Sequence, residues 1–421
     1  MIDNEFFCMS PWTHLNTNPN GDVITCCLSP TTEVLGNLNN NSIIEIWNSE
    51  KIKNLRINML NNLPSENICN RCYSKEKDGF TSLRTSFNDK YAEKFEDVVA
   101  STLPDGTVEK FNLVHWDFRL SNICNLKCRT CGPGFSSQWT QDWNKLYSNG
   151  DNKFPALIQI NQNSMKNLLS VILDNIDKVQ SIHFAGGEPL IMSEHYIIIE
   201  ELIKQKRFDV KLHYSTNFTN FKFGKKHIFD YWSKFDDIII TASIDAIGKR
   251  FNYIRNGSNW ETVHNNLKAF KAFEFNPKAV RLLFHPTISV FNIDHFPALE
   301  NYLIDNDHFQ TVKPIGFYES YYGNAIIVNP LLYPEHYSCR ILSQDLKEKI
   351  SKKLKIHEEE VLKYLNYHNE SIKSVSVFND LIMFMNQEDL SYLYPTFLEL
   401  TKKIDNLRHE DFYSTFPELN Y

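Results

Sequence analysis

The 421-residue sequence lacks the marks of a nucleic-acid-binding, membrane or secreted protein. Its formal net charge is −7, so it has no basic footprint for nucleic acid and no polybasic segment for an anionic membrane. Residues 1–7 contain neither a cationic segment nor a long apolar run, so we expect no signal peptide. No apolar run approaches the roughly 18 residues that a spanning helix needs. We therefore expect a cytoplasmic protein with neither nucleic acid nor membrane as a partner.

Cysteine is almost absent from the last two thirds of the chain. Eight of the nine cysteines precede residue 132, and the ninth is Cys339. In a reducing cytosol, cysteines clustered at short spacings indicate metal or cluster ligands rather than disulfides. A single cysteine can also be a small buried hydrophobic residue, and this interpretation suits Cys27 and Cys339.

Patterning divides the chain into four parts. Residues 1–95 hold five cysteines and turn-rich stretches, and residues 96–110, with the turn Pro104-Asp105-Gly106, are predicted to be a linker. Residues 111–317 alternate strand-like and helix-like runs, which indicates βαβ units. Residues 318–421 have helical spacing and predict a C-terminal cap without a chemical motif.

The sequence thus predicts an α/β fold: a partial (β/α)6 TIM-type barrel with a small cysteine-rich N-terminal domain and a helical cap. Strands are expected near 112–118, 179–184, 209–215, 237–244, 280–289 and 311–317. Helical stretches include 42–61, 194–205, 260–273, 293–304 and 346–367.

Three cysteines follow the first predicted barrel strand. Cys124, Cys128 and Cys131 have the spacing C-x3-C-x2-C. Three thiolates can hold three irons of a [4Fe–4S] cube, which leaves the fourth iron open to bind a small molecule. The alternative is a zinc site completed by a distant His or Cys, although structural zinc sites usually use paired doublets.

This loop and the segments that follow it resemble the radical S-adenosylmethionine (radical SAM) superfamily. Gly186-Gly187-Glu188-Pro189 is similar to the GGE motif of that family, which contacts the amino group of SAM. Ser215-Thr216-Asn217 resembles the TNG segment, and Ser243-Ile244-Asp245, followed by Arg255, resembles the SID(G) segment. The residue before the last cysteine, commonly aromatic in the family, is Thr130 here.

The resemblance implies a [4Fe–4S] cluster on Cys124, Cys128 and Cys131 whose open iron binds SAM. Reduction by a low-potential donor such as flavodoxin or ferredoxin then yields a 5′-deoxyadenosyl radical, which abstracts hydrogen from the substrate. Further contacts to SAM are expected from six residues: Gly186, Gly187, Glu188, Asn217, Ser243 and Arg255. For Asn217 and Ser243, turn formation or helix capping is an equal alternative.

Barrel enzymes carry out chemistry at the carboxyl ends of their strands. The cysteine loop, the GGE segment, Asn217 and Asp245 all fall at the ends of consecutive predicted strands, so we expect them on one rim. Asp245 is our candidate for a catalytic proton acceptor.

A second set of cysteines lies near the N-terminus. Gly21 predicts a hairpin between strands near 13–16 and 23–26, and the set resembles the twitch domain, a shortened SPASM domain. The resemblance implies an auxiliary [4Fe–4S] cluster. In the family this domain usually follows the barrel, whereas here it precedes it. A four-cysteine zinc site is the alternative. Neighbouring strand residues point to opposite faces, so we predict that Cys26 rather than Cys27 is the ligand. The predicted ligands are Cys8, Cys26, Cys69 and Cys72.

Together these patterns favour a radical SAM oxidoreductase with two [4Fe–4S] clusters and SAM as cofactors. Its substrate is a small polyol, sugar or aminocyclitol, or else a peptide or protein side chain; the absence of a recognisable precursor-binding domain favours the small molecule. A non-catalytic metal-binding interaction protein is the alternative from another class. His183, His213 and His285 on predicted strands are more often satisfied core histidines than catalysts.

Overall fold

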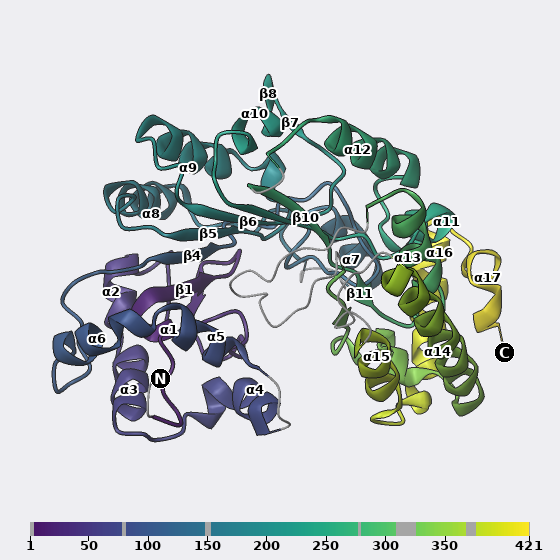
Figure 1. Ribbon diagram of the computed structural model, residues 1–421, viewed down its shortest axis with the longest axis horizontal. Helices are drawn as coiled ribbons and strands as arrows, with labels where there is room; N and C mark the ends of the chain where they lie inside the picture. Colours follow the sequence, from purple (N-terminus) through teal and green to yellow (C-terminus); the bar gives the residue numbers. More distant parts are fainter. Residues whose placement is uncertain are drawn as a thin grey trace.

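The computed structural model describes residues 4–77, 81–147, 153–276, 279–308, 326–367 and 376–420. At its centre is an eight-stranded sheet with the order β10-β9-β6-β5-β4-β1-β2-β3 (Figure 1). The five barrel strands are parallel, and sheet neighbours are also neighbours in chain order. This sequential winding is typical of a barrel and not of a doubly wound sheet. These strands are β4 (His115–Phe118), β5 (Ser181–Phe184), β6 (Lys211–Thr216), β9 (Ile238–Ala242) and β10 (Val280–Phe284).

The predicted α/β class and partial TIM-type barrel are therefore confirmed. The expected strand at 311–317 lies outside the described residues. Helices lie between the barrel strands: α7 (Trp139–Tyr147), α8 (Gln162–Asp174), α9 (Ser193–Lys204), α10 (Ile228–Trp232), α11 (Gly248–Ile254) and α12 (Trp260–Ala272). Helix α13 (Phe296–Asp305) follows β10. Short pairs β7 (Lys222–Phe223) with β8 (Lys226–His227), and β11 (Thr287–Ile288) with β12 (Asn329–Pro330), lie outside the main sheet.

The N-terminal domain is joined to the barrel through its strands. The predicted hairpin is present as β1 (His14–Thr17) and β2 (Asp22–Ile24), with a φ of +90° at Gly21, a conformation that favours glycine. Strand β2 pairs with β3 (Gly36–Asn37), while β1 pairs in parallel with β4. The hairpin thus extends the barrel sheet directly (Figure 1).

Helices α1 (Ser10–Thr13), α2 (Ile43–Trp47), α3 (Glu50–Leu60), α4 (Glu66–Lys77), α5 (Leu83–Lys90) and α6 (Phe95–Ser101) complete this domain. Ser42 and Glu45 form a capping box at the start of α2. The single helix expected over 42–61 is divided into α2 and α3, and the apolar residues Ile43, Ile46, Trp47 and Leu55 of these helices are all buried. The stretch expected to be a linker begins with most of α6 and continues into a bridge between Thr102 and Val108.

Side chains alternate between the two faces of the barrel strands. On one face, Trp116, Ile182 and Leu212 belong to the main hydrophobic core with residues of the surrounding helices. The other face carries Asp117 and His183, which line a cavity. Asp117 and His183 thus share the face opposite the helix-covered core, here called the inner face, and this face is where polar side chains can meet a ligand.

The C-terminal region is helical, as predicted. It consists of α14 (Gln344–Tyr367), α15 (Ser376–Asn386), α16 (Tyr394–Arg408) and α17 (Phe412–Thr415), which lie at one side of the barrel (Figure 1). Within the described ranges, no helix combines the length and apolar composition needed to cross a membrane.

Candidate functional site

A cavity of about 1280 Å³, here called the central cavity, lies at the carboxyl ends of the barrel strands. The loops after β4, β5, β6 and β9 all contribute to its lining, so the motifs expected on one rim do meet there. Two candidates, Glu188 and Asp245, are buried behind the lining. The predicted residues that line the cavity are Cys124, Cys128, Cys131, Gly186, Gly187, Asn217, Ser243 and Arg255.

The cysteine loop is held by backbone hydrogen bonds on two sides. The Lys127 amide donates to the Asn256 carbonyl and the Arg129 amide to the Ile254 carbonyl, both at 2.8 Å. On the other side, the Glu188 amide donates to the Ile123 carbonyl at 2.7 Å. The loop is therefore fixed between the end of α11 and the GGE segment.

The two glycines allow the GGE segment to approach this loop closely. Gly186 has a φ of +121°, a conformation that side chains rarely adopt. A Cβ atom on Gly187 would lie 2.0 Å from the carbonyl oxygen of Ile123. Packing against the cysteine loop thus requires glycine here, whatever the segment contributes to ligand binding.

Glu188 ties neighbouring loops together. Its buried carboxylate accepts hydrogen bonds from the Thr216 hydroxyl at 2.8 Å, the Asn217 amide at 2.7 Å and the Leu190 amide at 3.2 Å. Burial raises the pKa of Glu188 to about 7, against the opposing effect of these hydrogen bonds. The residue thereby fixes the position of Asn217 on the rim.

Asp245 holds Arg255. The Arg255 Nε and Nη2 atoms donate to the two carboxylate oxygens of Asp245 at 2.6 Å and 2.9 Å, and the Thr287 backbone amide donates to one of these oxygens at 2.8 Å. The remaining guanidinium nitrogen lies 3.9 Å from the sulfur of Cys128. This geometry favours a positioning role for Asp245 over that of the free proton acceptor considered from the sequence.

The C-terminal helices contribute contacts for which the sequence contains no spacing signal. Arg129, inside the cysteine loop, is fully buried and forms ion pairs with Asp405 and Glu410. The Tyr253 hydroxyl donates to Asp405 at 2.7 Å, and its ring lies 4.0 Å from the Arg129 guanidinium carbon. The helical cap therefore anchors the cysteine loop.

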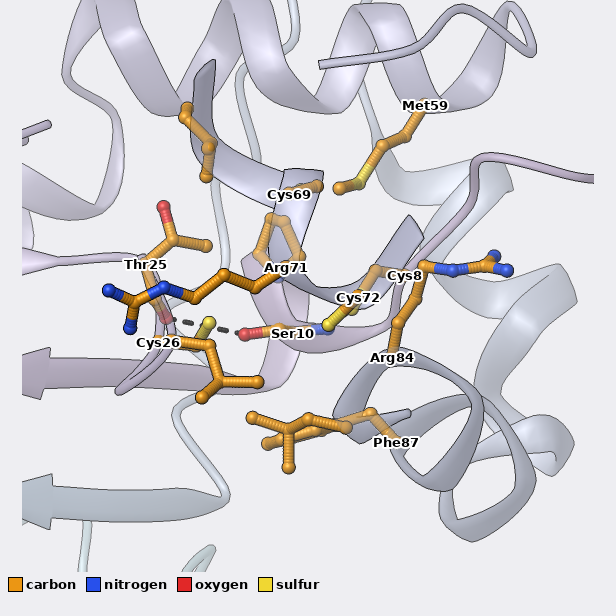
Figure 2. A pocket seen from close by; sticks show the side chains of 14 residues that line it. Cys8, Ser10, Thr25, Cys26, Met59, Cys69, Arg71, Cys72, Arg84 and Phe87 are labelled. Carbon is orange, nitrogen blue, oxygen red and sulfur yellow. Dashed lines mark hydrogen bonds between the residues drawn. The ribbon is translucent and has the colours of Figure 1, made fainter. Parts of the chain in front are cut away.

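The N-terminal cysteines form the second site. Cys8, Cys26, Cys69 and Cys72 line one cavity, here called the auxiliary cavity (Figure 2). Cys69 and Cys72 lie one turn apart on α4, whereas Cys26 follows β2. Cys27 lines a different cavity, although both cysteines lie in the turn after β2 and not on a strand, so strand alternation is not the reason. Burial raises the pKa of Cys69 to about 12, so this thiol needs a bound metal to become a thiolate at neutral pH.

The spacing of the cysteines bears on what they can hold. Four thiolates on one zinc ion would lie about 3.8 Å apart, since each zinc–sulfur bond is about 2.3 Å. Among the residues that the structure describes, no three His, Cys, Asp or Glu side chains are grouped closely enough to hold a single metal ion. Both sets of cysteines nevertheless line common cavities, which fits the wider span of a multi-iron cluster.

Comparisons with known proteins agree with an iron–sulfur role for both sets of cysteines. Residues 118–303 match the model of the radical SAM superfamily, and residues 8–73 match SPASM, an iron–sulfur cluster-binding domain. No curated protein matches the chain.

Two solved structures are similar to it. Native anSMEcpe with bound AdoMet is 19% identical, with a TM-score of 0.37 and coverage of 59% of this chain and 60% of that chain. Streptococcus suis SuiB bound to precursor peptide SuiA is 16% identical, with a TM-score of 0.35 and coverage of 69% and 61% respectively. The chain thus spans about three fifths of the length of each.

Proposed function

Because the chain belongs to the radical SAM superfamily and carries an iron–sulfur cluster-binding domain of the SPASM type, we propose that it oxidises its substrate by two electrons. Its cofactors are [4Fe–4S] clusters and SAM. When bound, they supply a 5′-deoxyadenosyl radical that removes a hydrogen atom from the substrate. The protein binds and orients the reactants, and it accepts the proton and the electron that the substrate radical must still lose.

In this proposal Cys124, Cys128 and Cys131 hold the SAM-cleaving cluster in the central cavity. Asn217 and Ser243 line the same cavity and offer polar groups to SAM. Arg255, oriented by Asp245, supplies a positive charge beside Cys128. The structural support is that residues from four separate loops line one cavity.

The single observation that carries the oxidative part of the proposal is the set of four cysteines around the auxiliary cavity. Four thiolates satisfy every iron of a [4Fe–4S] cube, so no iron is left to bind substrate. Such a cluster can then transfer electrons or have a structural role, and we propose electron transfer. The parallel pairing of β1 with β4 joins this domain directly to the barrel that holds the substrate.

The substrate in this proposal is a small polyol, sugar or aminocyclitol; a peptide side chain is the second candidate. SuiB was solved with a precursor peptide. The central cavity, at about 1280 Å³, exceeds the usual size of a small-molecule site, so it has room for SAM together with either class of substrate. A low-potential flavodoxin or ferredoxin would supply the first electron.

The oxidation predicts a product two hydrogens lighter than the substrate. Hydrogen abstraction removes one electron equivalent, and loss of a proton and a second electron completes a carbonyl, an imine or a new internal bond. Mass spectrometry of the reaction with the identified substrate measures this directly. An isomeric product would contradict the oxidation and leave the radical SAM chemistry intact.

A second prediction concerns metal content. Anaerobically reconstituted protein is expected to contain about eight iron and eight sulfide per chain, as two cubes require. The double substitution Cys69→Ala and Cys72→Ala is expected to remove about half of each, because it deletes two of the four auxiliary ligands. Elemental analysis and sulfide determination provide the measurement.

A matched pair of variants tests the auxiliary ligand set. Cys26→Ala is expected to lower the iron content, whereas Cys27→Ala, one residue away and outside the auxiliary cavity, is expected to retain it. Equal iron loss in both variants, or zinc in place of iron, would argue against the four-cysteine cluster.

A further inference from the structure

A third cavity, of about 220 Å³ and here called the interdomain cavity, lies between α4, α5 and the inner face of the barrel strands. It shares Cys72 with the auxiliary cavity and His183 with the central cavity. The interdomain cavity therefore lies between the two sets of cysteines. A group on its wall can interact both with a substrate in the central cavity and with the auxiliary site.

A row of polar side chains crosses the inner face of the sheet at this level. Asn16, Asp117, His183 and His213 are successive register partners on β1, β4, β5 and β6. The rings of His183 and His213 are stacked with centroids 4.3 Å apart. Because register partners share a face, the sheet itself brings together residues that are far apart in the chain.

Within this row, three side chains have the order of an acid–base triad. The Nδ1 atom of His183 lies 3.4 Å from a carboxylate oxygen of Asp117, and its Nε2 atom lies 2.9 Å from the Ser215 hydroxyl. Asp117 is buried, and Arg119 approaches its other oxygen at 3.5 Å. A carboxylate on one imidazole nitrogen fixes the tautomer and stabilises the imidazolium that forms when the other nitrogen takes a proton.

The Ser215 hydroxyl lies 2.9 Å from the Nε2 atom of His183 and 3.2 Å from the Thr241 hydroxyl, so its one proton can be donated to either. The Thr241 hydroxyl donates to the Tyr214 carbonyl at 2.8 Å, so its oxygen serves as an acceptor for its other neighbours. One of these is the Nε2 atom of His213 at 3.3 Å, which can supply a proton to Thr241. Ser215, which also lines the central cavity, can then donate to His183 while it accepts from a substrate.

The surrounding groups leave Asp117 as the negative charge that faces His183. Burial raises the pKa of Asp117, but Arg119 and His183 outweigh it and hold the pKa well below its usual range. Burial lowers the pKa values of His14 and His285 to about 4, and those of His115 and His213 well below their usual range. These four imidazoles are therefore neutral. The other titratable groups that line the interdomain cavity are Cys27, Arg71, Cys72 and Lys75.

We propose that His183, held by Asp117, accepts through Ser215 the proton that the substrate loses on oxidation. This proposal rests on the proposed function. The substrate's C–H bond gives a hydrogen atom to the 5′-deoxyadenosyl radical, its O–H or N–H bond gives a proton to His183, and one electron passes to the auxiliary iron–sulfur cluster. A C=O or C=N bond forms, so the reacting group is an alcohol or an amine. His183 is then a catalytic residue, and Asp117 is a positioning residue.

Histidine-selective 15N NMR of the anaerobic, cluster-loaded protein tests the triad without any substrate. His183→Gln identifies the resonance. In the wild-type protein, neutral His183 is expected to carry its proton on Nδ1, facing Asp117, and Asp117→Asn is expected to lower its proton affinity about tenfold. Asp209→Asn removes the same charge from an exposed pair with Arg207 and is expected to leave the titration unchanged.

Two results would overturn the proposal: a wild-type His183 that carries its proton on Nε2 when neutral, or a titration that is the same in Asp117→Asn and Asp209→Asn. The first needs no variant, so it holds even where Asp117→Asn does not fold. SAM cleavage by the wild-type preparation is measured in parallel. Failure of cleavage counts against the proposed function, whereas an unaltered His183 titration counts against the triad alone.

Discussion

Alanine at Cys124, Cys128 or Cys131 is expected to abolish the reductive cleavage of SAM. All three cysteines line the central cavity, and three thiolates are the minimum that leaves a [4Fe–4S] cube with one open iron. The loop is fixed by backbone hydrogen bonds to Asn256, Ile254 and Glu188, so it cannot shift to recruit another ligand. Chromatographic detection of 5′-deoxyadenosine after anaerobic reconstitution and addition of a strong reductant provides the measurement.

Cys339→Ala is the matched control for these variants. Cys339 is fully buried in the main hydrophobic core and lines neither cysteine cavity. It fits the small buried hydrophobe expected from its isolation in the sequence, and its replacement is expected to leave SAM cleavage intact. Undiminished cleavage by any one of the three loop variants would refute their assignment as ligands of the catalytic cluster.

Local patterns in the sequence were enough to predict several individual strands and helices. The turn at Gly21 between two short apolar runs predicted the hairpin of β1 and β2. Periodic apolar positions predicted α9 and α12 to within a residue or two of their bounds. Such features depend on contacts between residues that are close in the chain, so the chain itself displays them.

Long-range contacts were not predictable in the same way. The parallel pairing of β1 with β4 joins residues about one hundred positions apart, and no local pattern distinguishes it from a free hairpin. The interruption between α2 and α3 includes Asn48, whose side-chain amide donates to the Val108 carbonyl at 3.0 Å. Asp405 and Glu410 likewise show their partnership with Arg129 only once the C-terminal helices are in place.

The histidines show most clearly what could not be predicted from the sequence, namely which face of a strand is covered by helices. His183 and Phe184 are neighbours on β5, and strand alternation shows that they face opposite sides without showing which side is lined by helices. Phe184 packs in the core, whereas His183 lines both the central and the interdomain cavity. His195, by contrast, is a core histidine: its Nε2 atom lies 3.0 Å from the Tyr214 hydroxyl, and its ring packs among aromatic side chains.

Gly187→Ala is expected to displace the cysteine loop. The added Cβ would lie 2.0 Å from the carbonyl oxygen and 2.5 Å from the carbonyl carbon of Ile123, one residue before Cys124. Backbone cannot yield as a flexible side chain does, so we expect a loss of stability of about 3 kcal/mol or more. We also expect little SAM cleavage, because any shift that relieves the overlap moves the cysteine ligands. Thermal unfolding and the iron content of the reconstituted protein measure the two effects.

Gly134→Ala separates this steric effect from a general intolerance of side chains near the site. Gly134 also lines the central cavity, but a Cβ there would meet nothing within 4 Å. This variant is therefore expected to retain its stability and its full iron content. If Gly187→Ala were as stable as Gly134→Ala and bound as much iron, the close packing of the GGE segment on the cysteine loop would not be what fixes the cluster ligands. A loss confined to Gly187→Ala means instead that the second glycine of the motif is needed for the loop that holds the cluster, before any contact with SAM is considered.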